Sequence, residues 1–181
     1  MRKMLVFALA TVAVFAFSVT ASAQLIDQDQ PSGPVYMAGF AQGDLAQSFQ
    51  QTNANCSGAG ILLQAGIGST DNVTISLWDA LPNAGGTMLA SASAMGTAGE
   101  WVDVFWGYYP VTPATTYYLV FDGNLTLGIA GDVNDPYPNG NVFANPGYNP
   151  FPFYDYAFRT YYTTSVPTEA HSWSDVKGLF D

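Results

Sequence analysis

Three features of the 181-residue sequence predict an all-β fold, an antiparallel jelly-roll-like β-sandwich of about eight or nine strands. From Leu45 onward, apolar residues mostly recur at every second position, the period of a strand with one buried face. Clusters of Gly, Pro, Asn and Asp separate these segments, and no long stretch here has a convincing helical period. An eight-stranded double-sheet roll accommodates this number of strand segments better than an immunoglobulin-sized sandwich does.

Each expected strand is an alternating or β-branched segment bounded by turn residues. The expected strands cover residues 45–51, 60–65, 73–79, 88–94, 101–108, 115–121, 126–130 and 154–163. In the third strand Thr74, Ser76 and Trp78 share one face opposite three aliphatic residues, so one face packs inward and the other meets solvent or a second layer. The strand at 101–108 is apolar on both faces, which predicts a central strand or one that lines a binding surface.

The N-terminus has the features of a cleaved signal peptide. Arg2 and Lys3 precede an apolar run that ends at the small residues of Ala21-Ser22-Ala23, so we expect cleavage after Ala23. The run is shorter than the ~20 apolar residues of a spanning helix, so no stable transmembrane anchor is expected. The predicted organisation is a signal peptide at 1–23, an N-terminal extension at 24–37, the β-sandwich domain at 38–164 and a C-terminal tail at 165–181. We therefore expect a secreted or cell-surface protein, and the short apolar signal is typical of bacteria.

Charge and cysteine content exclude several classes of protein. The chain has 4 basic and 14 acidic residues and a net charge of -10. Cleavage of the signal removes two bases and no acid, so the mature chain is still more acidic. A nucleic-acid partner is therefore not expected. Cys56 is the single cysteine, so no internal disulfide can form and the hydrophobic core has to supply stability.

The residues needed for common hydrolytic sites are scarce, so we expect no enzyme. His171 is the single histidine and lies in the predicted tail, which argues against a catalytic triad and against zinc. Glu100 and Asp103 are three residues apart on a predicted strand, so their side chains point to opposite faces. A glycan-cleaving pair of carboxylates from two different strands remains a minor alternative.

A structural calcium ion is the one cofactor that the sequence suggests. Asp132, Asn134 and Asp135 place hard oxygen donors in one loop, and Ca²⁺ selects such donors. Asp and Asn beside Gly and Pro are also typical of plain turns. Both interpretations remain open at this point.

The segment 135–154 is unusually rich in aromatic residues and proline. Because proline lowers the entropy of a free loop, rings held there can stack on a flat ligand such as a sugar at little ordering cost. The candidate ligand-binding residues are Tyr137, Tyr148 and Phe151 in this segment, with Trp106, Tyr108 and Tyr109 as an extension of the same surface. The alternatives are that the rings cover an open end of the sandwich, or that they form a protein contact surface.

Several short motifs resemble a known family. They are LAQSF at 45–49, VTISLWD at 73–79, TMLA at 87–90, TPATTYYLV at 112–120 and YDYAFRTY at 154–161. Together they resemble the choice-of-anchor type β-sandwich domains of bacterial surface and secreted proteins, over residues 38–163. The resemblance implies a carbohydrate-binding-module-like sandwich with no established catalytic role.

The sequence thus predicts an exported, non-catalytic module that binds a glycan or another extracellular ligand at the cell surface or in the matrix. The alternative is a structural subunit of an extracellular assembly, for example a homo-oligomer in which the aromatic loop or the tail packs on a neighbouring copy.

Overall fold

The computed structural model describes residues 22–165, and these residues form two antiparallel β-sheets with no α-helix. Two short 3-10 turns, η1 (Phe40–Gln42) and η2 (Pro82–Ala84), complete the regular structure. Within the described residues no helix is long and apolar enough to cross a membrane. The predicted tail lies almost wholly outside this range, as does the predicted signal peptide.

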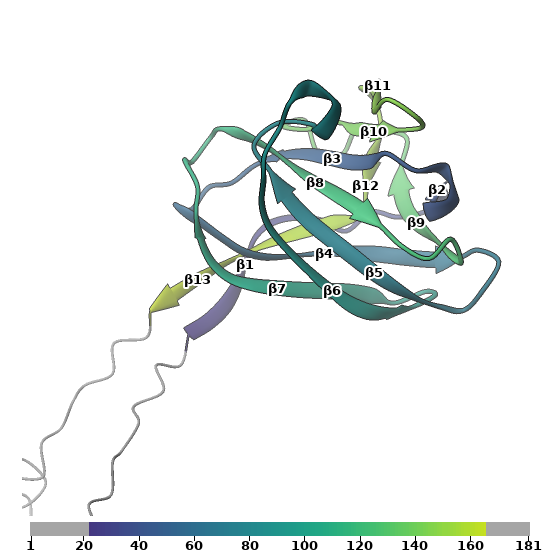
Figure 1. Ribbon diagram of the computed structural model, residues 1–181, viewed down its shortest axis with the longest axis horizontal. Helices are drawn as coiled ribbons and strands as arrows, with labels where there is room; N and C mark the ends of the chain where they lie inside the picture. The colour runs from purple at the N-terminus through teal and green to yellow at the C-terminus, as the bar shows by residue number, and fades with distance from the viewer. Residues whose placement is uncertain (1–21, 166–181) are drawn as a thin grey trace, which may run out of the picture. The chain divides into compact units, whose positions relative to one another are not determined.

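The larger sheet has seven strands. They are β1 (Ser22–Gln30), β2 (Val35–Gly39), β4 (Asn55–Ala65), β7 (Trp101–Pro110), β9 (Leu127–Asp132), β12 (Asp155–Tyr156) and β13 (Phe158–Ser165). Strand β4 is its centre, since it pairs with β7, β9 and β13. Strands β1 and β13 are neighbours, so the two ends of the described chain lie side by side (Figure 1).

The second sheet has six strands in the order β11-β10-β3-β8-β5-β6. They are β3 (Leu45–Gln50), β5 (Thr70–Trp78), β6 (Met88–Thr97), β8 (Thr116–Asp122), β10 (Val142–Ala144) and β11 (Asn149–Phe151). Figure 1 shows β10 and β11 at one end of this sheet, where the segment rich in aromatic residues joins the fold.

The core forms between the two sheets from alternating apolar positions. In the six-stranded sheet, Leu77 lies opposite Leu119 in the β5–β8 register, and both side chains are fully buried. In the seven-stranded sheet, Leu63 lies opposite Ile129, and both are again fully buried. Burying one such side chain contributes about 1.5–3 kcal/mol relative to its exposure. The period of two therefore places apolar side chains of both sheets in one shared core.

The all-β class and the antiparallel sandwich are confirmed, and strand is found in all eight expected ranges. The strand count is larger than expected, with thirteen strands in residues 22–165. The strand expected at 154–163 is divided into β12 and β13 at Ala157, whose N–H donates to Ala130 O and whose carbonyl accepts from Leu62 N. Strands β10 and β11 have three residues each, too few for a pattern of alternation to be read.

The segment 24–37, expected as an N-terminal extension, contributes most of β1 and the first three residues of β2 to the seven-stranded sheet. The reason is chemical, because inward positions of β1 are glutamines and not apolar residues. Gln30 is buried and its Nε2 donates to Tyr156 O at 3.0 Å, while Gln28 Oε1 accepts from the Tyr137 hydroxyl at 2.9 Å. A search for apolar alternation misses a strand that is anchored by hydrogen bonds.

Candidate functional site

Strands β10 and β11 form a tight hairpin whose tip is held from both sides. Val142 pairs with Phe151 at the base of this hairpin. At the tip, Gly147 N donates to Asp44 Oδ2 at 2.7 Å, and Asn83 Nδ2 donates to Gly147 O at 2.7 Å. Gly147 has φ of 92°, a conformation that glycine adopts without strain. The hairpin is therefore fixed relative to β3 and to the β5–β6 loop.

Aromatic rings gather where this hairpin returns to the sheet. Phe151 and Tyr154 are stacked, with ring centroids 5.9 Å apart and ring planes inclined by 9°. Tyr154 N donates to Phe151 O at 3.1 Å, which closes a turn containing Pro152. Phe153, within that turn, is 69% exposed. Proline and the backbone hydrogen bond together hold the stacked pair in one arrangement.

A cavity of about 220 Å³, here called the hairpin hollow, lies beside the stacked pair. It is lined by Met37, Gln42, Val142, Ala144, Asn145, Phe151, Tyr154 and Tyr156. A smaller hollow of about 160 Å³ also includes Phe151 and Tyr154 in its lining. Drug-sized ligands occupy pockets of ~300–1,000 Å³, so the hairpin hollow suits a single ring-sized group.

The wall of the hairpin hollow includes a tyrosine with an unsatisfied hydroxyl. Tyr156 is fully buried, and its ring packs edge-on against Phe121 at a centroid distance of 5.6 Å. Its hydroxyl has no hydrogen-bond partner within the described part of the chain. Burial raises the pKa of this phenol, so it remains a neutral donor at physiological pH. An unpaired buried hydroxyl costs about 1–3 kcal/mol.

A buried polar network positions Tyr156 and the start of the aromatic segment. Asp155 accepts from Gln47 Nε2 at 2.8 Å and from Tyr137 N at 2.9 Å. Gln47 Oε1 in turn accepts from Tyr156 N at 3.0 Å. Burial raises the pKa of Asp155, although these hydrogen bonds oppose the shift. The network ties β3, β12 and the loop after β9 together behind the hairpin hollow.

The structure separates the three ring residues predicted in segment 135–154. Phe151 lines the hairpin hollow. Tyr137 is a core residue, since it is 8% exposed and its ring meets Phe158 edge-on at 5.0 Å. Tyr148 is half-buried at the hairpin turn and does not line the hollow, and burial together with Asp44 raises its pKa. Only one of the three is placed to stack on a ligand in the hairpin hollow.

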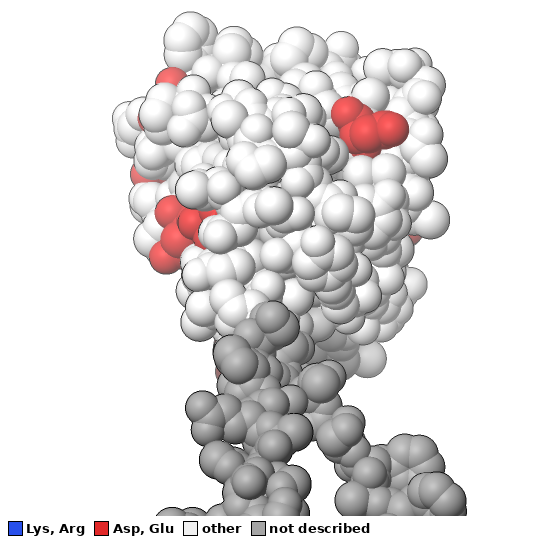
Figure 2. All heavy atoms as spheres, turned by 90° about the vertical axis from the view of Figure 1, so that its left-hand side faces the viewer, with Lys and Arg blue, Asp and Glu red and all other residues white. Residues whose placement is uncertain are grey.

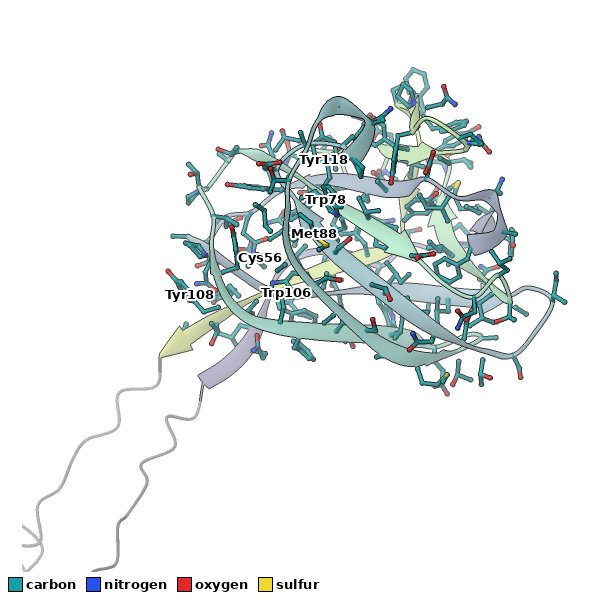
Figure 3. The ribbon with its side chains drawn as sticks, in the orientation of Figure 1. Cys56, Trp78, Met88, Trp106, Tyr108 and Tyr118 are labelled. Carbon is teal, nitrogen blue, oxygen red and sulfur yellow. The ribbon has the colours of Figure 1, made fainter. Side chains whose placement is uncertain are left out.

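The predicted extension at Trp106, Tyr108 and Tyr109 does not join this site. Trp106 and Tyr109 pack against the core, and Trp106 Nε1 donates to Cys56 O at 3.1 Å. Tyr108 is 64% exposed. Figure 3 shows Tyr108 and Trp106 toward the end of β7, well away from β10 and β11. Positive φ at Gly107 and the register shift near Cys56 turn Trp106 and Tyr109 inward.

The predicted metal ligands form a hydrogen-bonded turn after β9. Asp132 Oδ1 accepts from Asn134 N at 3.0 Å and from Asn134 Nδ2 at 2.7 Å, and Asp132 Oδ2 accepts from the Ser32 hydroxyl. The Ser32 hydroxyl and Asn134 lower the pKa of Asp132. Asp135 follows with φ of 51°. In residues 22–165 no three His, Cys, Asp or Glu side chains group as metal ligands, and calcium binding stays a prediction.

A row of large side chains on the outer face of the six-stranded sheet was not anticipated as a surface. Trp78 lies opposite Tyr118 on one side and Met88 on the other. Figure 3 shows these three side chains in a row across the sheet. Tyr118 also meets Phe143 edge-on at 5.7 Å. The outward position of Trp78 with Thr74 and Ser76 was the sequence signal, but the partners from other strands require the register.

Acidic groups dominate the charge of the described domain. Residues 22–165 contain eleven Asp or Glu and a single basic residue, Arg159. Its Nε donates to Asp103 Oδ1 at 2.8 Å, its Nη2 donates to Asp103 Oδ2, and its guanidinium lies 4.3 Å from the Trp101 ring centroid. Figure 2 shows one side of the molecule, where acidic groups are scattered and no basic group is visible. This domain thus offers no uncommitted cation to an anionic ligand.

No protein-family model matches the sequence, and no curated protein matches it. The resemblance to choice-of-anchor type domains therefore stays a prediction.

Proposed function

We propose that this protein is an exported, non-catalytic β-sandwich module that binds a neutral glycan, with one sugar ring in the hairpin hollow. The observation that carries the proposal is a cavity whose lining includes the fixed stack of Phe151 and Tyr154.

The stacked pair supports binding of a ring with an apolar face. Sugar rings present C–H groups on their faces, and aromatic side chains bury large apolar area at small entropic cost. Phe151 and Tyr154 line both hollows, so a ligand is able to contact them from more than one side. Their fixed arrangement means that little ordering is needed on binding.

Polar groups around the hairpin hollow are placed to orient a bound ligand. Gln42 Oε1 already accepts from Gly39 N at 2.9 Å, and this bond orients the Gln42 amide at the edge of the hollow. Few fixed polar groups in an apolar cavity are typical of small-molecule sites.

Charge favours a neutral ligand. Eleven acids and one paired arginine give the described domain a strongly negative field, which repels uronic, sialic and sulfated sugars. Asp155, the acid adjacent to Tyr156, is fully buried with both carboxylate oxygens hydrogen-bonded. It is therefore poorly placed to protonate a bound sugar, which supports binding without cleavage.

The experiment is a glycan array probed with the exported chain, followed by calorimetry on a retained neutral oligosaccharide. Phe151→Ala should weaken binding at least about tenfold, equivalent to ~1.4 kcal/mol. Tyr108→Ala is the matched control, because it removes an exposed ring far from the hollow and should leave affinity unchanged. The proposal would be contradicted if the protein retained only anionic glycans or no glycan at all. It would also be contradicted if both variants lost affinity equally.

A further inference from the structure

Strand β6 (Met88–Thr97) forms an open edge of the six-stranded sheet. It is the last strand in the sheet order, and β5 is its one strand partner among residues 22–165. From Ala90 to Thr97 its pairing with β5 is regular. No strand among residues 22–165 pairs with its opposite side, although β7 lies beside β6, so the backbone N–H and C=O groups there have no strand partner and another strand is able to pair with them.

Three other edge strands, β11, β1 and β7, carry features that discourage strand pairing. Strand β11 has three residues, one of them Pro150, and β1 carries Asp27 and Asp29. Strand β7 contains Asp103, has positive φ at Gly107 and ends at Pro110. Short length, charge, proline and irregular backbone are the usual protections of natural edges. Strand β6 has ten residues and contains neither a charged residue nor proline.

The sequence of β6 is nearly the same in both directions. Residues 90–94 read Ala-Ser-Ala-Ser-Ala, symmetrical about Ala92. In a two-fold antiparallel pair with Ala92 at the axis, Ser91 lies opposite Ser93 of the second copy. These small side chains let two strands approach without a clash, and hydroxyl pairs across strands are favourable. Within one chain, Ser93 already makes such a contact with Thr74, Oγ to Oγ1 at 2.7 Å.

Charge and exposure also favour a second copy at this strand. Two copies of so acidic a chain repel each other, and a strand without acids is where that repulsion is weakest. Met88 and Met95 are 54% and 69% exposed near the two ends of β6, so pairing would cover apolar surface as well.

We infer that β6 is the docking edge for a second copy of this chain. The two β6 strands pair antiparallel about a two-fold axis, which joins two six-stranded sheets into one continuous sheet. No residue of β6 lines the hairpin hollow, so pairing and glycan binding are separable.

Sedimentation equilibrium of the full exported chain tests this inference. The parent should show a concentration-dependent dimer. Ser91→Lys/Ser93→Lys and Ser91→Asp/Ser93→Asp should each raise the dimer dissociation constant at least about tenfold, because like charges then face each other. A one-to-one mixture of the two variants should restore dimers. Ser91→Thr/Ser93→Thr, which adds no charge, should still dimerise.

A cross-link provides a second measurement that does not depend on charge. Ala92→Cys should give a disulfide-linked dimer under mild oxidation, because two copies of residue 92 meet at the axis. Thr74→Cys, on neighbouring β5, should not cross-link, and Cys56 is buried and does not compete. A monomeric parent at all concentrations, charged variants that dimerise as tightly as the parent, or equal cross-linking of the two cysteine variants would overturn the inference.

Discussion

Replacing Tyr156 by phenylalanine should stabilise the protein. The same change at a buried tyrosine normally destabilises the fold, because the hydroxyl loses its hydrogen bond. The hydroxyl is fully buried without a partner, and the ring is held by its edge-on contact with Phe121, so phenylalanine keeps the shape and removes only the unpaired group. An unsatisfied hydroxyl costs about 1–3 kcal/mol. We expect the free energy of unfolding to rise by about 1 kcal/mol and Tm by roughly 2–4 °C.

Tyr137→Phe is the matched control, because the same atom is removed from a buried ring whose hydroxyl is satisfied. The Tyr137 hydroxyl donates to Gln28 Oε1 at 2.9 Å and accepts from Gln50 N at 3.2 Å, so its removal should lower stability by about 1 kcal/mol. Urea denaturation of the three proteins without ligand measures both effects. If Tyr156→Phe is destabilised as much as Tyr137→Phe, the Tyr156 hydroxyl is hydrogen-bonded in the folded protein and our interpretation is refuted.

Three further predictions concern calcium binding at the Asp132 turn, the pH dependence of stability due to Asp71 and the close backbone contact at Gly140. If the turn at Asp132 holds calcium only in the folded state, calcium at 100 times its dissociation constant should stabilise by roughly 2.7 kcal/mol. An unchanged Tm between chelator and millimolar calcium would exclude the ion. Burial alone would raise the pKa of Asp71, but bonds from Thr126 N and Asn124 N outweigh it and lower the pKa. The stability difference between parent and Asp71→Asn should therefore persist above about pH 4 and shrink as the pH falls further; a difference that grows on acidification would contradict this. A Cβ at Gly140 would lie 2.0 Å from Ser48 O, so Gly140→Ala should destabilise by about 1–3 kcal/mol in urea melts, and an unchanged midpoint would show that the loop relaxes freely.

The main strands were predictable because their core contacts follow the local period of two. Leu77 and Leu63 both lie on alternating apolar faces, and the structure buries both. Strand β1 was missed because Gln28 and Gln30 anchor it through hydrogen bonds to residues more than 100 positions away. Local patterning contains no information about such partners, since the fold creates them.

The candidate site was less predictable, because aromatic rings of the same loop lie in different environments in the folded protein. Tyr137 and Phe151 occur in similar Pro-rich surroundings, yet Tyr137 enters the core while Phe151 lines the hairpin hollow. The difference arises from distant polar groups, namely Gln28 and Gln50, which satisfy the Tyr137 hydroxyl. Tyr156 gave no sequence signal, because only the folded structure reveals a hydroxyl without a partner.

Backbone amide chemical shifts of this protein, followed during titration with a neutral oligosaccharide, test the proposed glycan site most directly. We expect saturable shift changes concentrated at Asn145, Phe151 and Tyr154 around the hairpin hollow, and much smaller changes around Trp78 and Tyr118. Changes centred on that outer sheet face, or no changes with any neutral glycan tested, would contradict binding in the hairpin hollow.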